Sequence, residues 1–206
     1  EKPEGRLPVM TKSLPISKVN KLIDRLYNIV EAKQKIYWVC SLVEESEELD
    51  LQAATKRFEF LKTKFKGKVL LIHGQLKEKE KENVMKKFQN EDYSILVATT
   101  VIEVGVNVPN ASLMIVENSE RLGLAQLHQL RGRVGRGSEK SICILMYQSP
   151  LSDNAKERLD ILRQSNDGFI IAQKDLELRG PGEILGTQQT GIASMKIANI
   201  VRDTYL

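Results

Sequence analysis

The sequence lacks an apolar run of membrane-spanning length, and its first residues, Glu1 to Gly5, do not resemble a signal peptide. Its only two cysteines, Cys40 and Cys143, are far apart, and each lies inside an apolar run with no zinc-binding spacing around it. We therefore expect a soluble, intracellular protein with free thiols in buried strands and no metal site of its own.

The sequence also lacks a strong charge of either sign. Its 31 Lys and Arg residues against 27 Asp and Glu residues leave a net charge of +4, which permits a nucleic-acid partner without indicating one. A length of 206 residues is sufficient for one sizeable core with a small appendage.

The most unusual stretch is residues 126–137. Within it, arginines and glycines alternate: Arg131, Gly132, Arg133, Gly135, Arg136 and Gly137. Glycine costs a helix roughly 1 kcal/mol relative to alanine, so this pattern predicts a helix over residues 124–131 that opens into a loop. Planar guanidinium groups on such a loop are suited to bidentate contact with phosphate, so we interpret the stretch as a polyanion site.

The run from Gln129 to Arg136 resembles the Q-x-x-G-R-x-G-R motif VI of superfamily 2 helicases. In that family the motif lies on the second RecA-like motor domain and faces ATP held by the first. The resemblance implies that Arg133 and Arg136 are arginine fingers on the γ-phosphate and that Gln129 senses the nucleotide. It also implies that Gly132 and Gly135 give the nucleotide clearance.

The remaining pattern predicts an α/β fold in which a RecA-like parallel sheet is sandwiched by helices. Short apolar, β-branched runs predict five buried strands, over residues 36–43, 68–73, 94–98, 112–117 and 141–147, and helical patterns alternate with them. We expect an interdomain linker over residues 1–15, the motor domain over 16–148, and a helical hairpin with a glycine-rich loop over 149–206.

Two further stretches resemble helicase motifs. His73 and Gly74 match the H-G pair of motif IVa, whose loop contacts the nucleic-acid backbone. The run from Thr99 to Pro109 resembles motif V, which implies that Thr99 binds a DNA phosphate, that Gly105 makes a turn and that Asn107 contacts the nucleotide ribose. Asp is common at the position of Asn107, and an amide can still accept the ribose hydroxyl without adding charge.

After Pro150 the pattern is helical, with helices expected over residues 153–163 and 168–178 and Ser152 as a cap for the first. The glycine-rich segment after Leu178 argues against a long helix there. It resembles the translocation motif of RecG-type branched-DNA helicases and of transcription-repair coupling factors. That resemblance implies that Arg179, Glu183 and Gln189 couple ATP-driven domain closure to movement along double-stranded DNA.

No G-x-x-x-x-G-K-[ST] phosphate loop and no D-E-x-x box occurs in the sequence, so half of an ATPase site is absent from it. We therefore expect this chain to be inactive alone, with ATP and Mg²⁺ bound mainly by a first motor domain elsewhere in the protein.

The resemblance as a whole implies the C-terminal motor half of an ATP-dependent, double-strand DNA translocase of the bacterial cytoplasm. Such a helicase remodels branched DNA, by replication fork regression and Holliday junction branch migration, in recombination and repair. Its implied partners are branched or double-stranded DNA and the first motor domain and wedge domain of the same protein, with no membrane. Two alternatives stay open: the motor of a transcription-repair coupling factor and a non-enzymatic DNA-binding module.

Overall fold

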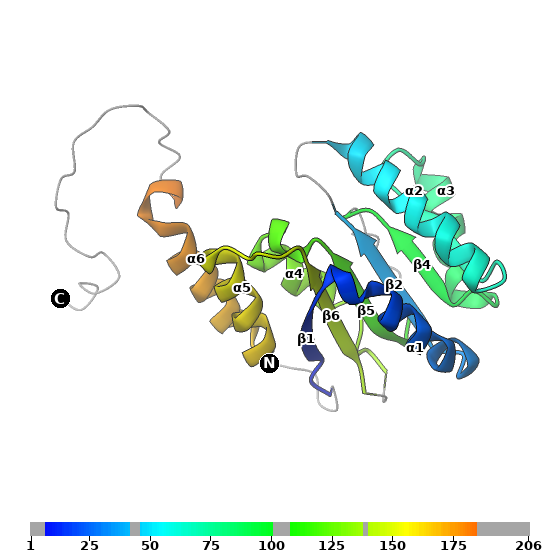
Figure 1. Cartoon of the computed structure of the whole chain (residues 1–206), viewed down its shortest axis with the longest axis horizontal. Coiled ribbons are helices and arrows are strands. Elements are labelled where there is room, and N and C mark those ends of the chain that lie inside the picture. Colours follow the sequence, from blue (N-terminus) through cyan, green and yellow to red (C-terminus); the bar gives the residue numbers. More distant parts are fainter. Residues whose placement is uncertain (1–6, 42–45, 101–107, 138–139, 185–206) are drawn as a thin grey trace.

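The computed structural model describes residues 7–41, 46–100, 108–137 and 140–184, the last five of these by their backbone alone. Its centre is a parallel sheet with the strand order β1-β6-β5-β2-β4-β3 (Figure 1). The strands are β1 (Met10–Pro15), β2 (Lys35–Cys40), β3 (Val69–Ile72), β4 (Ile95–Ala98), β5 (Ala111–Glu117) and β6 (Ile142–Tyr147).

Helices cover both faces of this sheet. One face packs against α1 (Val19–Glu31) and α2 (Glu47–Lys64). The other face packs against α3 (Glu78–Asn90), α4 (Leu124–Arg131), α5 (Asp153–Gln164) and α6 (Gly168–Ile184). Two short 3-10 helices, η1 (Ile16–Lys18) and η2 (Ser119–Arg121), complete the described elements.

The two-sided burial explains the apolar strand sequences. Along β2, Trp38 belongs to the core under α1 and α2, whereas its neighbours Tyr37 and Val39 belong to the core on the opposite face. Successive side chains of a strand point to opposite faces, so a sheet covered on both sides needs continuous apolar runs. The predicted α/β sandwich is confirmed, and so is the expectation that Cys40 and Cys143 are buried free thiols.

The sheet has one strand more than predicted. Residues 10–15, interpreted as part of a linker, form the edge strand β1, which pairs in parallel with β6 from Met10 opposite Ile142 to Pro15 opposite Tyr147. An edge strand pairs on one side only, so it tolerates a proline that a central strand would not. The proline content therefore did not exclude a strand here.

The ends of three helices show how local sequence and structure compare. Ser17 lies inside η1, and the N-cap position of α1 belongs to Lys18, whose side chain makes no cap hydrogen bond. Helix α6 runs to Ile184 through Gly180, Pro181 and Gly182, although intrinsic propensity argues for an end near Leu178. The expected cap at Ser152 is confirmed, since its hydroxyl accepts a hydrogen bond from the Ala155 N–H at 3.2 Å.

Within the described residues, no helix is both long and apolar enough to cross a bilayer. The same part of the chain contains no group of three or more His, Cys, Asp or Glu side chains placed to hold a metal ion. Helices α5 and α6 contact each other and α4, and the hairpin geometry expected for them stays a prediction.

A buried lysine fastens α3 to the sheet. Lys35 is 6% exposed, and its ammonium group donates hydrogen bonds to the carbonyl oxygens of Phe88, Glu91 (3.0 Å) and Tyr93 (2.9 Å). These carbonyls lie at and just beyond the C-terminal end of α3, where helix carbonyls lack partners and the helix dipole favours a cation. Lys35 therefore caps a helix from the neighbouring strand.

We expect the Lys35→Met variant to lose about 1.5 to 3 kcal/mol of unfolding free energy, because three acceptors lose a charged donor while the aliphatic stem is kept. Urea denaturation of the chain measures this loss. Lys18→Met, which changes an exposed lysine, is the matched control and should stay within about 0.5 kcal/mol of the wild type. An equal effect of both substitutions would contradict the capping role.

We also expect the stability to fall in alkali. Burial raises the pKa of the Cys143 thiol from 9.0 to about 12, against a smaller lowering by Arg131. As the pH rises, the unfolded chain therefore releases this proton before the folded chain does. The stabilisation is fully present below pH 9 and is lost as the pH rises towards 12, at up to about 1.4 kcal/mol of unfolding free energy per pH unit. Urea denaturation at pH 9, 10 and 11 should show a shallower decline for Cys143→Ala than for the wild type, and identical slopes would contradict this account.

Candidate functional site

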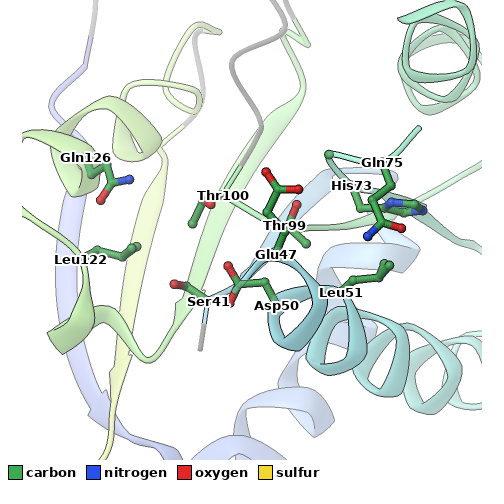
Figure 2. Close-up of a pocket in the computed structure, with 11 residues that line it drawn as sticks. Ser41, Glu47, Asp50, Leu51, His73, Gln75, Thr99, Thr100, Leu122 and Gln126 are labelled. Carbon is green, nitrogen blue, oxygen red and sulfur yellow. The ribbon is translucent and has the colours of Figure 1, made fainter. Parts of the chain in front are cut away.

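A cavity of about 320 Å³ opens at the carboxyl ends of the central strands (Figure 2). The chain leaves β2 towards α2 on one face of the sheet and leaves β5 towards α4 on the other face. Such a reversal between adjacent strands leaves a crevice outside the sheet, the usual place for a ligand in open α/β folds. Its lining residues are Ser41, Glu47, Asp50, Leu51, His73, Gly74, Gln75, Thr99, Thr100, Leu122 and Gln126.

The three predicted DNA-binding residues meet in this cavity. His73 and Gly74 directly follow β3, and Thr99 directly follows β4, so the pairing of these strands brings them together. Among the described residues, the Thr99 Oγ1 and His73 Nδ1 atoms are buried and have no hydrogen-bond partner. Buried polar atoms without a partner are costly, so both are candidates for contact with a ligand.

Sequence reasoning missed several polar residues of the cavity: Ser41, Glu47, Asp50, Gln75, Thr100 and Gln126. Ser41 was hidden by the predicted strand over residues 36–43, because β2 ends at Cys40 and leaves Ser41 at the edge where the parallel strands end. Gln126 could not be found from a strand end, since it comes from the first half of α4 and lies across the cavity from α2 (Figure 2).

The arginine loop lies at the opposite end of α4. Arg133 is half-buried and Arg136 is exposed, and neither guanidinium forms an ion pair with any residue that the structure describes. The Nε of Arg136 donates to the Gly132 carbonyl at 3.3 Å. Burial raises the pKa of Tyr37 to about 12, and the charges of Arg133 and Arg136 oppose that rise. The loop therefore presents positive charge beside β2 and away from the cavity.

Glycines let the arginine loop pack closely against the amino-terminal side of the sheet. Gly135 has φ +75°, and an added Cβ would lie 2.8 Å from the Val9 side chain. A Cβ on Gly137 would lie 2.6 Å from the Pro109 carbonyl oxygen. A Cβ on Gly132 would lie 3.3 Å from the Gln129 carbonyl oxygen. All three close neighbours belong to this chain, so packing within the fold favours glycine at these positions independently of any nucleotide.

Arg131 does not present its fork to a ligand, contrary to the expectation for all three arginines. It is 2% exposed, and its Nη1 donates to the carbonyls of Leu162 (2.6 Å) and Ser165 (2.8 Å) and to the Thr11 hydroxyl (3.2 Å). Its Nη2 lies 3.0 Å from Nδ1 of His128. Arg131 therefore joins α4 to the end of α5 and to β1, which is a structural role.

The coupling residues are described only in part. Arg179 forms an ion pair with Asp175 at 2.9 Å, and a Cβ on Gly123, the N-cap residue of α4, would lie 4.0 Å from its Nη2. The side chain of Glu183 and all of Gln189 lie outside the described residues, as do Gly105 and Asn107. Gln129 is exposed on α4 and is not among the cavity residues.

Comparison with protein families gives two matches. The model of the helicase conserved C-terminal domain matches residues 17–138, and the model of domain 3, C-terminal, of the ATP-dependent DNA helicase RecG matches residues 165–206.

Individual relatives agree with the family models. The chain is 58% identical to the ATP-dependent DNA helicase RecG of Acidithiobacillus ferridurans over 99% of its length, and 58% identical to that of Escherichia coli (strain K12) over 98%. It spans 30% of the length of each of these relatives. Among solved structures, RecG bound to a three-way DNA junction is 42% identical, with a TM-score of 0.76, over 89% of this chain and 24% of that one.

The structural role of Arg131, which Arg133 and Arg136 do not share, can be tested by measuring the stability of variants. Arg131→Lys should destabilise the chain by about 2 to 4 kcal/mol, because a lysine cannot reach the three oxygen acceptors and leaves buried groups unpaired. Arg133→Lys is the matched control and should change the unfolding free energy by less than about 0.5 kcal/mol. Thermal and urea unfolding measure the unfolding free energy of both variants. An equal loss in the two variants would show that Arg133 also has a structural role.

Proposed function

Because the chain belongs to the helicase conserved C-terminal domain family, we propose that it is the second motor domain and C-terminal region of a RecG-type DNA helicase. The intact protein uses ATP to remodel branched DNA in the bacterial cytoplasm, by fork regression and Holliday junction branch migration. The observation that carries this proposal is the arginine loop, where Arg133 and Arg136 stand without carboxylate partners among the described residues.

The loop fits the phosphates of a nucleotide. Two guanidinium groups that form no ion pair with a described residue offer the planar donors that match phosphate oxygens, and the neighbouring Arg131 is already occupied within the fold. ATP with Mg²⁺, held mainly by a first motor domain, supplies the phosphoryl bond whose hydrolysis drives the motor. In this proposal Arg133 and Arg136 stabilise charge on the γ-phosphate and Gln129 senses the nucleotide.

The other nucleotide contacts proposed for this chain come from its loops. Gly105 and Asn107, outside the described residues, provide the turn and the ribose contact, while Gly132 and Gly135 keep the backbone close to the nucleotide. Val108 and Pro109 directly follow Asn107, and Pro109 lies against Gly137 in the arginine loop. This closeness supports a single nucleotide site built from both loops.

DNA is proposed to bind at the cavity between α2 and α4. Thr99 donates its hydroxyl to a backbone phosphate, and the loop of His73 and Gly74 contacts the same strand. Support comes from the buried, unpartnered Oγ1 and Nδ1 atoms and from the similarity to RecG solved with a three-way junction. We propose branched or double-stranded DNA as the substrate, with the first motor domain and a wedge domain of the same protein as partners.

Two other functions are less well supported. A transcription-repair coupling factor would share the motor motifs, but the 58% identity and the match over residues 165–206 are both to RecG. A non-enzymatic DNA-binding module would leave Arg133 and Arg136 without a task, because neither of them lines the cavity that holds Thr99 and His73.

We expect Arg136→Ala in the intact protein to lower ATP turnover by about 10³ to 10⁵-fold, since an arginine finger contributes about 4 to 7 kcal/mol to the transition state. DNA binding should persist, because Arg136 is not among the cavity residues. Steady-state ATPase and DNA-binding assays measure the two effects. Near-normal turnover by Arg136→Lys would show that simple charge suffices and would contradict the finger assignment.

We propose that Arg179, Glu183 and Gln189 couple ATP hydrolysis to movement on DNA. Arg179→Ala or Gln189→Ala should leave DNA-stimulated ATPase largely intact while junction unwinding falls steeply. The measurement is ATP consumed per junction resolved at saturating DNA, with Arg163→Ala on the exposed surface of α5 as the matched control. An unchanged ratio with both rates reduced would place these residues in catalysis or folding instead.

A further inference from the structure

The cavity proposed to hold DNA offers a phosphate no lysine or arginine side chain within the part of the chain that the structure describes. Two of its lining residues, Glu47 and Asp50, are carboxylates. Phosphate is usually bound by Lys and Arg, with release of counterions from the nucleic acid. The polar groups that remain here are hydroxyl, amide and imidazole groups, which bind phosphate more weakly than charged donors do.

The two carboxylates lie at the start of a helix, where a phosphate would otherwise be attracted. Glu47 is the first residue of α2 and Asp50 lies in its first turn, where Ser46 caps the helix by accepting from the Leu49 N–H at 3.4 Å. The start of a helix attracts anions through its dipole, and acidic residues in the first turn offset that attraction. Figure 2 shows both carboxylates turned towards the same space as Thr99.

The cavity is nevertheless built for a ligand. Thr99 is 5% exposed, and its Oγ1 has no partner among the described residues although it borders the cavity. His73 Nδ1, on the adjacent loop, is likewise buried and has no hydrogen-bond partner among the described residues. The Thr99 Oγ1 and His73 Nδ1 atoms therefore share one small space with the carboxylates of Glu47 and Asp50.

We propose that Glu47 and Asp50 lower the affinity of the cavity for a DNA backbone phosphate, so that each phosphate is released as the motor advances. This inference rests on the proposed function, since it takes the cavity as the site of DNA contact. In this proposal the Thr99 hydroxyl and the His73 ring position the phosphate, and the two carboxylates raise its dissociation rate. A cationic site would bind the backbone more tightly and would release it more slowly.

The test is Glu47→Gln in the intact protein, with Glu48→Gln as the matched control. Both residues are exposed in the first turn of α2, but only Glu47 borders the cavity. Stopped-flow dissociation of a labelled duplex at low salt should be about three- to tenfold slower for Glu47→Gln, as expected for removing one charge several ångströms from a phosphate. Glu48→Gln should stay within about twofold of the wild type.

Glu47→Lys provides a second variant. It should tighten duplex binding further and steepen the salt dependence of the affinity by about one unit, because a new cation then meets a phosphate. Branch migration at saturating DNA should slow in both Glu47 variants. Unchanged or faster dissociation for Glu47→Gln, or equal slowing by Glu48→Gln, would overturn the inference.

Thr99→Val separates this inference from the proposed function. If that variant binds duplex as tightly as the wild type, the cavity is not the DNA site and the proposed function loses its DNA contact. If Thr99→Val weakens binding while Glu47→Gln leaves dissociation unchanged, the DNA site stands and only the role of the carboxylates is wrong. Circular dichroism and thermal midpoints of each variant check that folding is unaffected.

Discussion

A parallel sheet that is covered by helices on both faces leaves only its strand ends and connecting loops available for function, and the rest of this structure depends on that constraint. Apolar side chains of the strands fill both cores. Polar side chains such as Thr99 and His73 consequently appear at the residues that directly follow β4 and β3. The reversal between β2 and β5 then opens the space in which these side chains meet.

Helix α4 connects this space to the arginine loop. Gln126, in its first half, borders the cavity, and Arg133 and Arg136 follow its last residue. Between these ends, Arg131 binds the helix to α5 and β1 with hydrogen bonds from one guanidinium group. A short helix held this firmly gives the proposed DNA contact and the proposed nucleotide contact a fixed spacing.

Much of this arrangement was predictable from sequence. The predicted bounds of the helix over residues 124–131 are confirmed, because the glycine and arginine pattern fixes where a helix must end. The different roles of Arg131 and Arg133 were not predictable, since spacing along the chain does not tell which arginine meets buried carbonyls of α5. Edge strand β1 was missed because β6, the strand with which it pairs, is distant in sequence. At the start of α2, Glu47 borders the cavity and Glu48 does not, a difference that residue type and spacing along the chain do not reveal.

The close approach of Gly137 to Pro109 has an evolutionary consequence. Their backbones leave no room for even a methyl group, so position 137 cannot gain a side chain unless the entry to β5 is rebuilt. Arg136 next to it faces solvent and meets no such steric barrier. The backbone path of the loop at position 137 can therefore change only together with that of the segment before β5, whereas the side chain at position 136 is limited by function and not by space.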